Sequence, residues 1–387
     1  MNETGKRRGR LAVLSVAHLF NDWYMNFIQT LLPFFVLAGM GVSRGAFLVS
    51  AFTTTSSLLQ PIFGYLADRR GQRWIVYVGT VWMALLLGLL GVTTSYARLL
   101  ALALLAGLGT AAFHPQAAAM VGTLAGARKG WHLAVFAAAG NVGWALTPLI
   151  VVPVVTAQGL GITPLFILPG VLAAMLLWVA APRVAAATSA TAEPFLPALR
   201  SVWCELLKIV LVVSLRSLAY FGLIAFLPLH MQARGINLTQ SGRLLFLMLL
   251  SGAVGGMLGG SLSDRFGRKV VTIVSLALST PLFLWFFHSS GPLSVALLCL
   301  AGAALLASFS VTVALAQELI SRNAAIASGL TLGFGIGMGG LGVGLVGMFI
   351  ERAGVDAAVS LLAWCPLAAG LLALLLRPRA ASANAAA

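Results

Sequence analysis

The sequence predicts an all-α integral membrane protein with twelve transmembrane helices in two similar six-helix halves. Three observations predict it: the composition, the number of long apolar runs and an internal repeat. Hydrophobic residues make up 60% of the 387 residues and charged residues 9%, whereas a soluble domain has roughly 25% charged residues. So few polar side chains cannot cover a water-soluble core of this size, which excludes a large cytosolic enzyme. Helices are expected because each backbone group in a bilayer must be satisfied within its own segment.

The net charge of +15 does not indicate a nucleic-acid partner. The basic residues lie in small groups between apolar runs, without the interleaved aromatic residues typical of nucleic-acid binding. Three cysteines are scattered along the chain and show no metal-binding or redox spacing. We therefore predict neither a metal site nor a cofactor.

Twelve apolar runs are long enough to cross a bilayer, which takes about 20 residues in a helix. They do not alternate with period two, as the strands of a membrane β-barrel would. The runs cover residues 11–37, 46–67, 74–94, 97–123, 131–157, 162–182, 205–232, 241–263, 270–288, 292–318, 324–350 and 355–377.

The longest polar gap lies between the sixth and seventh runs. It reads "PRVAAATSATAEPFLPALRS" and is rich in Ala, Ser, Thr and Pro, a composition typical of a linker. We predict an N-terminal half at 1–182, a cytoplasmic linker at 183–204, a C-terminal half at 205–379 and a disordered tail at 380–387.

The distribution of basic residues predicts the orientation in the membrane. With the N-terminus placed in the cytoplasm, eighteen of the 24 Lys and Arg residues fall in inside segments and five in outside segments. Because cytoplasmic loops carry the excess of Lys and Arg, we predict that both termini are cytoplasmic. The expected location is the bacterial cytoplasmic (inner) membrane.

A charged segment repeats in the two halves. "FGYLADRRGQR" at 63–73 and "GGSLSDRFGRK" at 259–269 lie 196 residues apart, about half of the chain. Two halves with the same orientation imply an approximate twofold axis along the membrane normal. Transporters are commonly built in this way, with a substrate site between the halves near the midplane.

The repeated G-x-L-x-D-R-x-G pattern resembles the cytoplasmic loop signature of the major facilitator superfamily, and the resemblance covers essentially the whole chain. The fifth run is similar to the antiporter signature, but Thr147 stands where a glycine is usual before Pro148. Other stretches resemble the fosmidomycin-resistance type of exporter: "HLFND" at 18–22, "FHPQA" at 113–117, "GNVGWALTP" at 140–148, "LRSLAYFGLIAFLP" at 215–228 and "ASGLTLGFGIGMGGLG" at 327–342.

The resemblance implies that the repeated loops latch the two halves together when the cytoplasmic side is closed. Asp68 and Asp264 would face helix N-termini of the opposite half, where a carboxylate is favourable by about 0.3–1 kcal/mol. Ordinary basic connectors are the alternative. The other residues expected in this latch and gate are Gly64, Arg69, Gly71, Arg73, Arg128, Gly260, Arg265, Gly267, Arg268, Glu318 and Arg322.

Ionisable side chains inside the predicted helices are candidates for function, because they are costly to bury in a membrane. Asp22 lies about 17 Å into the first helix at 1.5 Å per residue, and His18 is one turn earlier on the same face. A carboxylate that binds and releases a proton is what proton coupling needs. We predict Asp22 and His18 as the proton-coupling residues, and the alternative is a structural, hydrogen-bonded carboxylate.

Arg216 lies at a similar depth in the seventh run, the repeat counterpart of the first. A guanidinium keeps its charge when it is buried. We therefore expect it to face Asp22 in the empty protein and an anionic substrate in the loaded one. A static strut bonded to backbone carbonyls or to Asn141 is the alternative. The remaining predicted substrate contacts are polar or aromatic: Asn21, Trp23, Tyr24, His114, Asn141 and Tyr220.

A run of glycines at 333–344 marks the eleventh helix. No lysine follows it as in a phosphate-binding loop, and it lies within an apolar segment. Close helix packing explains it better.

These features together predict a monomeric secondary transporter that alternates access by rocking its two halves. The first choice is proton-coupled antiport that exports a small polar or anionic compound, with the lipid bilayer, protons and that compound as the only partners. The second choice is a metabolite or siderophore transporter of the same fold, with import as an open direction. A membrane sensor without transport is the remote alternative, and no ATP-binding motif is present.

Overall fold

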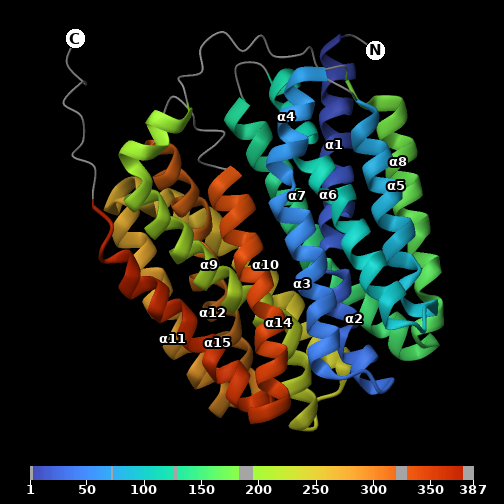
Figure 1. Cartoon of the computed structure of the whole chain (residues 1–387), viewed down its shortest axis with the longest axis vertical. Helices are drawn as coiled ribbons and strands as arrows, with labels where there is room; N and C mark the ends of the chain where they lie inside the picture. The colour runs from blue at the N-terminus through green and yellow to red at the C-terminus, as the bar shows by residue number, and fades with distance from the viewer. Residues whose placement is uncertain (1–2, 71–72, 126–128, 183–194, 320–328, 378–387) are drawn as a thin grey trace.

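The computed structural model describes residues 3–70, 73–125, 129–182, 195–319 and 329–377. These residues form helices joined by short turns, and no strand occurs among them. Figure 1 shows the helices of the N-terminal half, blue to green, beside those of the C-terminal half, green to red.

The helix bounds follow the predicted runs closely. The N-terminal half contains α1 (Glu3–Met25), α2 (Phe27–Leu37), α3 (Val42–Leu58), α4 (Gln60–Arg70), α5 (Trp74–Gly88), η1 (Leu90–Val92), α6 (Tyr96–Ala125), α7 (Lys129–Gln158), η3 (Leu160–Phe166) and α8 (Ile167–Ala180). The C-terminal half contains α9 (Phe195–Ala233), α10 (Leu238–Phe266), α11 (Arg268–His288), α12 (Gly291–Leu319), η5 (Gly329–Gly335), α14 (Ile336–Ala353) and α15 (Val355–Ala373).

The prediction of twelve spanning helices is confirmed. Eleven helical segments of the described chain are long and apolar enough to cross a membrane. The remaining span, which comes first in the chain, consists of α1 and α2 and is divided between them at Asn26. Asn26 donates from Nδ2 to the backbone oxygen of Trp144, 3.0 Å away on α7, so the break ties the first helix to the fifth.

Other spans also differ in detail from the predicted runs. The second is interrupted at Leu59, two residues before Pro61, because a proline lacks the N–H that the preceding turn needs. The eleventh begins with the π-helical segment η5. The seventh helix, α9, starts at Phe195, within the stretch predicted as linker.

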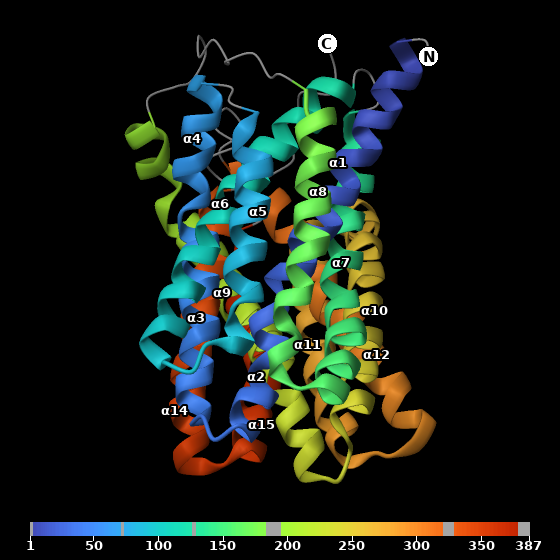
Figure 2. The same cartoon turned by 90° about the vertical axis from the view of Figure 1, so that its right-hand side faces the viewer.

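The two halves meet through two pairs of helices that the internal repeat makes equivalent. α3, the second span, packs against α14, the eleventh, while α7, the fifth, packs against α10, the eighth. Figure 2 shows α14 behind α3 and α10 behind α7 from the side. Each pair therefore exchanges places with the other under the approximate twofold axis.

Glycines on α14 allow the α3–α14 pair to approach closely. A Cβ atom on Gly340 would lie 2.7 Å from Thr53 Cβ, and one on Gly337 would lie 2.9 Å from Leu58 Cδ2. Real Cβ atoms essentially never show contacts under 3.0 Å. The predicted packing role of the glycine run is confirmed at these positions.

The cross-half polar contacts of α3 and α14 include one at the end of the molecule opposite the termini (Figure 1). Ser43 Oγ donates to Glu351 Oε1 over 2.6 Å. About two turns further along, Ser50 Oγ donates to the backbone oxygen of Gly340 over 2.8 Å, and the Gly344 N–H donates to Ser50 Oγ over 2.8 Å. The α3–α14 contact therefore closes the end away from the termini.

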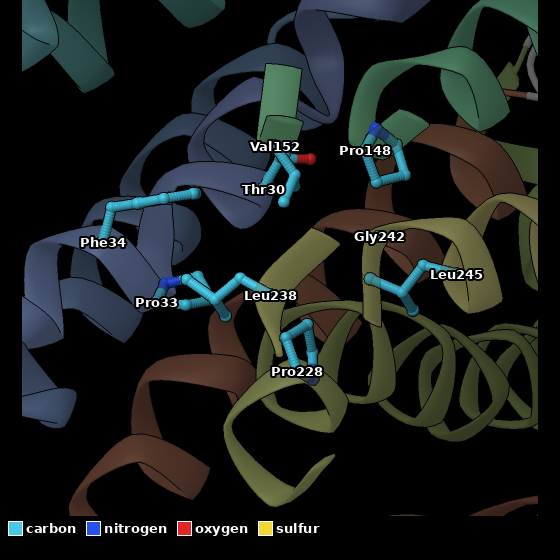
Figure 3. A pocket seen from close by; sticks show the side chains of 9 residues that line it. All are labelled: Thr30, Pro33, Phe34, Pro148, Val152, Pro228, Leu238, Gly242 and Leu245. Atoms are coloured by element: carbon cyan, nitrogen blue, oxygen red, sulfur yellow. The ribbon is translucent and has the colours of Figure 1, made fainter. Parts of the chain in front are cut away.

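An apolar pocket also lies where α2, α7, α9 and α10 meet (Figure 3). Pro33 and Pro228, which are counterparts in the repeat, lie on its wall together with Pro148 of α7. Thr30 supplies the one side-chain hydroxyl of the lining. Such a pocket suits apolar packing between the halves and offers no partner for a charged ligand.

Candidate functional site

The candidate site centres on one carboxylate and two histidines in the N-terminal half. Asp22 Oδ1 lies 3.0 Å from Nε2 of His114, which reaches it from α6. Asp22 Oδ2 lies 3.3 Å from Nε2 of His18, one turn earlier on α1. The side chains of Asp22 and His114 are 14% and 22% exposed and that of His18 is 8% exposed, so the cluster is largely withdrawn from its surroundings.

Backbone carbonyls hold both histidine rings from the other side. His18 Nδ1 lies 2.7 Å from the backbone oxygen of Phe136, and His114 Nδ1 lies 3.0 Å from that of Thr110. The Thr110 hydroxyl also donates to Asn21 Oδ1 over 2.6 Å. Asn21 is therefore held inside the same network, and its buried Nδ2 has no hydrogen-bond partner among the described residues.

The packing of α7 against α1 brings these groups together. A Cβ atom on Gly140 would overlap Asp22 Oδ2 and lie 2.6 Å from His18 Cε1. The Phe136 ring stacks on His18 with centroids 3.9 Å apart. Gly140 therefore leaves the space in which the Asp22 and His18 side chains lie.

The three potential ligand atoms of His18, Asp22 and His114 lie within 4.8 Å of one another, so their spacing alone would also admit a metal ion. Spacing alone does not establish a metal site, and the sequence predicts none.

Arg216 is the buried charge of the C-terminal half. It is 2% exposed, and its guanidinium carbon lies 4.8 Å from the centre of the Phe309 ring. Its hydrogen bonds are long, at 3.4 Å to Thr312 Oγ1 and 3.5 Å to Ser217 Oγ. No carboxylate of the described chain lies within ion-pair distance of it, and the two partners of Asp22 are histidines of its own half. The structure thus does not bring Asp22 and Arg216 into direct contact.

Tyr220 and Trp144 connect the two halves near this level. Tyr220 is one turn after Arg216 on α9, and its ring centroid lies 6.2 Å from that of Trp144 on α7. Tyr220 lies within electrostatic range of both Asp22 and Arg216. Asn141 is exposed on α7 and makes no hydrogen bond with another described residue.

Trp23 and Tyr24 face the interior of the N-terminal half. The Tyr24 hydroxyl bonds to the backbone oxygen of Phe166 and accepts from the Gly170 N–H over 2.8 Å. The Trp23 ring lies 5.6 Å from Phe166, and Trp23 is 4% exposed. We therefore leave both aromatic residues out of the proposed binding site.

The second charged loop forms a cluster within the C-terminal half. Arg268 on α11 lies 2.6 Å from Asp264 on α10 and 3.2 Å from Glu318 on α12. Lys269 donates to the backbone oxygens of Leu374 and Leu376, just after the end of α15, over 2.7 and 2.6 Å. The ion pair of Asp264 therefore joins helices of one half, and the sequence did not predict the contact of Lys269 with the backbone after α15.

The remaining loop residues are only partly described. Gly267 adopts a φ of +89°, which favours glycine, whereas Gly64, Arg73, Gly260 and Arg265 occupy helical or adjoining positions. The side chains of Asp68 and Arg69, together with Gly71, Arg128 and Arg322, lie outside the described residues.

Sequence reasoning missed several residues that build the site. Thr110 could have been found, because it lies one turn before His114 on α6. The Phe136 carbonyl, Phe309 and Thr312 gave no sequence signal, since their roles depend on how helices far apart in the chain pack together.

The fold and the site define a class of protein: a membrane transporter of two six-helix halves with buried charged groups between its helices. The sequence profile of the Major Facilitator Superfamily matches residues 14–329 and 209–387. The chain belongs to this superfamily of secondary transporters, as the loop motifs predicted.

Two relatives match over nearly the whole chain. An uncharacterized MFS-type transporter of Bacillus subtilis, YfnC, is 31% identical over 95% of this chain and 92% of its own length. The fosmidomycin resistance protein of Escherichia coli is 28% identical over 93% of this chain and 90% of its own.

Solved structures show the same fold at low identity. The nucleoside transporter NupG superposes with a TM-score of 0.79 at 13% identity, covering 95% of this chain and 98% of its own. A bacterial homologue of the lysosomal transporter Spinster superposes with a TM-score of 0.77 at 18% identity, covering 96% and 95%.

Proposed function

We propose that this transporter is a proton-coupled antiporter that exports a small polar or anionic compound, with both termini in the cytoplasm. The observation that carries the proposal is that Arg216 is buried without a carboxylate partner among the described residues. A buried guanidinium cannot lose its proton under physiological conditions, and leaving a buried charge without a partner is strongly destabilising. Its two long hydrogen bonds and one aromatic face leave capacity for a bidentate anion.

The likeness to the fosmidomycin resistance protein supports a phosphonate as the first compound to test. Fosmidomycin carries a phosphonate, which matches the planar fork of donors on a guanidinium. The cluster of Asp22 with His18 and His114 belongs to the other half, so proton and substrate would bind to different halves. A ligand shifts the balance between the inward- and outward-facing states only by its difference in affinity for them. The proton and the exported compound can both do so if each binds one state more tightly.

With the termini in the cytoplasm, the Ser43–Glu351 contact would lie on the external side and hold the two halves together there. Protons entering from outside would then drive the exported compound outward. An importer of a metabolite or siderophore is the second candidate, because its fold and loop motifs would be the same.

The test compares Arg216→Gln with Arg216→Lys in the purified protein, using fosmidomycin and its neutral phosphonate diester as ligands. Hydrogen bonds to a charged group are worth about 1.5–3 kcal/mol, so the Gln variant should bind the anion about 10- to 150-fold more weakly. The Lys variant should lose less, and neither should change binding of the diester. Equal losses for both ligands would indicate a structural role for Arg216.

A further inference from the structure

We infer that the cluster of His18, Asp22 and His114 carries two exchangeable protons, with each histidine holding one of them against a different oxygen of Asp22. This inference rests on the proposed function, because it deepens the proton site of the same transporter. It changes the role of His114, which the sequence placed among the substrate contacts. The inference follows from the positions of the four ring nitrogens.

The Nδ1 atoms of both histidines are committed to donating. A backbone carbonyl oxygen only accepts hydrogen bonds, and each Nδ1 faces one, at 2.7 Å for His18 and 3.0 Å for His114. The hydroxyl hydrogen of Thr110 points to Asn21 Oδ1, so Thr110 Oγ1 is an additional acceptor for His114 at 3.3 Å. Each neutral imidazole therefore carries its single hydrogen on Nδ1.

That tautomer leaves a bare lone pair on each Nε2, and both lone pairs face Asp22. The contacts measure 3.0 Å from His114 to Oδ1 and 3.3 Å from His18 to Oδ2. The His18 contact is not aligned as a hydrogen bond, and its Nε2 is a buried nitrogen without another partner. Without an added hydrogen, two acceptors oppose each other at both contacts, which is unfavourable in a medium of low dielectric.

Each contact requires one proton, and one proton cannot serve both. If Asp22 is ionised, both histidines must be imidazolium ions. If Asp22 carried one proton toward one histidine, the other histidine would still be charged, but imidazole is a stronger base than a carboxylate, so both protons lie on the rings. Both arrangements contain two added protons and a net charge of +1. The cluster without them, with Asp22 ionised and both histidines neutral, carries −1. Loading therefore changes the charge of the N-terminal half by two units.

The surroundings provide few competing titratable groups. From α9, Tyr220 lies within electrostatic range of Asp22 and Arg216. α7 faces the cluster with Phe136 and Gly140, and α6 adds Phe113, whose ring lies 6.0 Å from His18. The two protons are thus held by the three named residues.

The experiment counts ring protons without any transported compound, by nitrogen-15 NMR of histidine-labelled protein in lipid over a pH series. The sequence has five histidines, so single variants assign the signals. We expect the neutral rings of both His18 and His114 to carry hydrogen on Nδ1. At low pH both Nε2 atoms should become protonated. The matched control, His288→Gln at the exposed end of α11, should remove one signal and leave these two unchanged.

Asp22→Asn gives the decisive comparison. An amide accepts at one atom and donates at the other, so a single added proton satisfies both contacts. One histidine should remain neutral where both are charged in the wild type. If this variant does not fold, His18→Gln should leave His114 with the Nδ1–H tautomer and one exchangeable proton.

Three outcomes would overturn the inference: a neutral Nε2–H tautomer in either histidine, a single proton for the wild-type pair, or one bound metal ion per protein by elemental analysis. None of them depends on whether fosmidomycin is transported. The proposed function therefore stands or falls separately, on the binding and transport assays.

Discussion

Gly140→Ala should disrupt the proton site by steric overlap alone, without removing a charged or polar group. The added methyl would overlap Asp22 Oδ2 and lie 2.6 Å from His18 Cε1 and 2.9 Å from His18 Nδ1. Ordinary contacts begin at 3.4 Å, so His18 would have to move away by most of an ångström. That movement lengthens its contacts with Phe136 and Asp22 together.

Overpacking of this kind costs roughly 1–3 kcal/mol, which corresponds to about a 5- to 150-fold shift between states. Alanine also favours a helix over glycine by about 1 kcal/mol, so the net loss of stability should be smaller than the loss of coupling. The matched control is Gly256→Ala on α10, where the nearest atom to the added Cβ would be Leu306 O at 3.5 Å.

The assay measures fosmidomycin transport driven by a pH gradient in proteoliposomes, together with the thermal unfolding midpoint in detergent. Gly140→Ala should lose most pH-driven transport while still binding fosmidomycin, whereas Gly256→Ala should behave as wild type in both measurements. Equal transport by the two variants would refute the placement of Asp22 and His18 against Gly140.

The remaining predictions concern Asp22 and the two ends of the molecule. Asp22→Asn should abolish pH-driven transport and retain fosmidomycin exchange, which a counterflow assay measures; accumulation against a gradient by this variant would exclude Asp22 as the coupling carboxylate. Glu351→Gln should weaken the closed end opposite the termini and raise the labelling rate of cysteines placed there, whereas Arg352→Gln should not; equal labelling in both would contradict the gate. Asp264→Asn should lower turnover and alter labelling from the termini end with little change in affinity, while Arg200→Gln on α9, outside the latch, tests the general effect of charge loss; normal turnover and labelling would show that Asp264 is not part of a latch.

Much of the fold was predictable because hydrophobic length and loop charge act locally. The twelve spans and the repeat follow from apolar runs and from the motif around Asp264. The glycines of the eleventh helix pointed to close packing, which Gly340 shows against Thr53.

The partners of the charged residues were less predictable, because they depend on which helix faces which. Asp22 and His18 were placed on one face of α1 by their spacing. The position of His114 on α6 did not reveal that its Nε2 would reach the same carboxylate. Arg216 was expected to face Asp22 because they occupy equivalent places in the repeat. In the structure Asp22 contacts His18 and His114, whereas Arg216 lies against Phe309 and Thr312.

The most direct test of proton-coupled export is the direction of fosmidomycin flux in proteoliposomes when the pH gradient is reversed with the membrane potential held at zero. Antiport predicts that fosmidomycin accumulates on the more acidic side for either sign of the gradient, that Arg216→Gln abolishes this accumulation and that His288→Gln preserves it. With two protons exchanged for each molecule, one pH unit should sustain about a 100-fold concentration ratio, compared with about tenfold for one proton. Accumulation on the alkaline side, or no response to the gradient, would contradict the account.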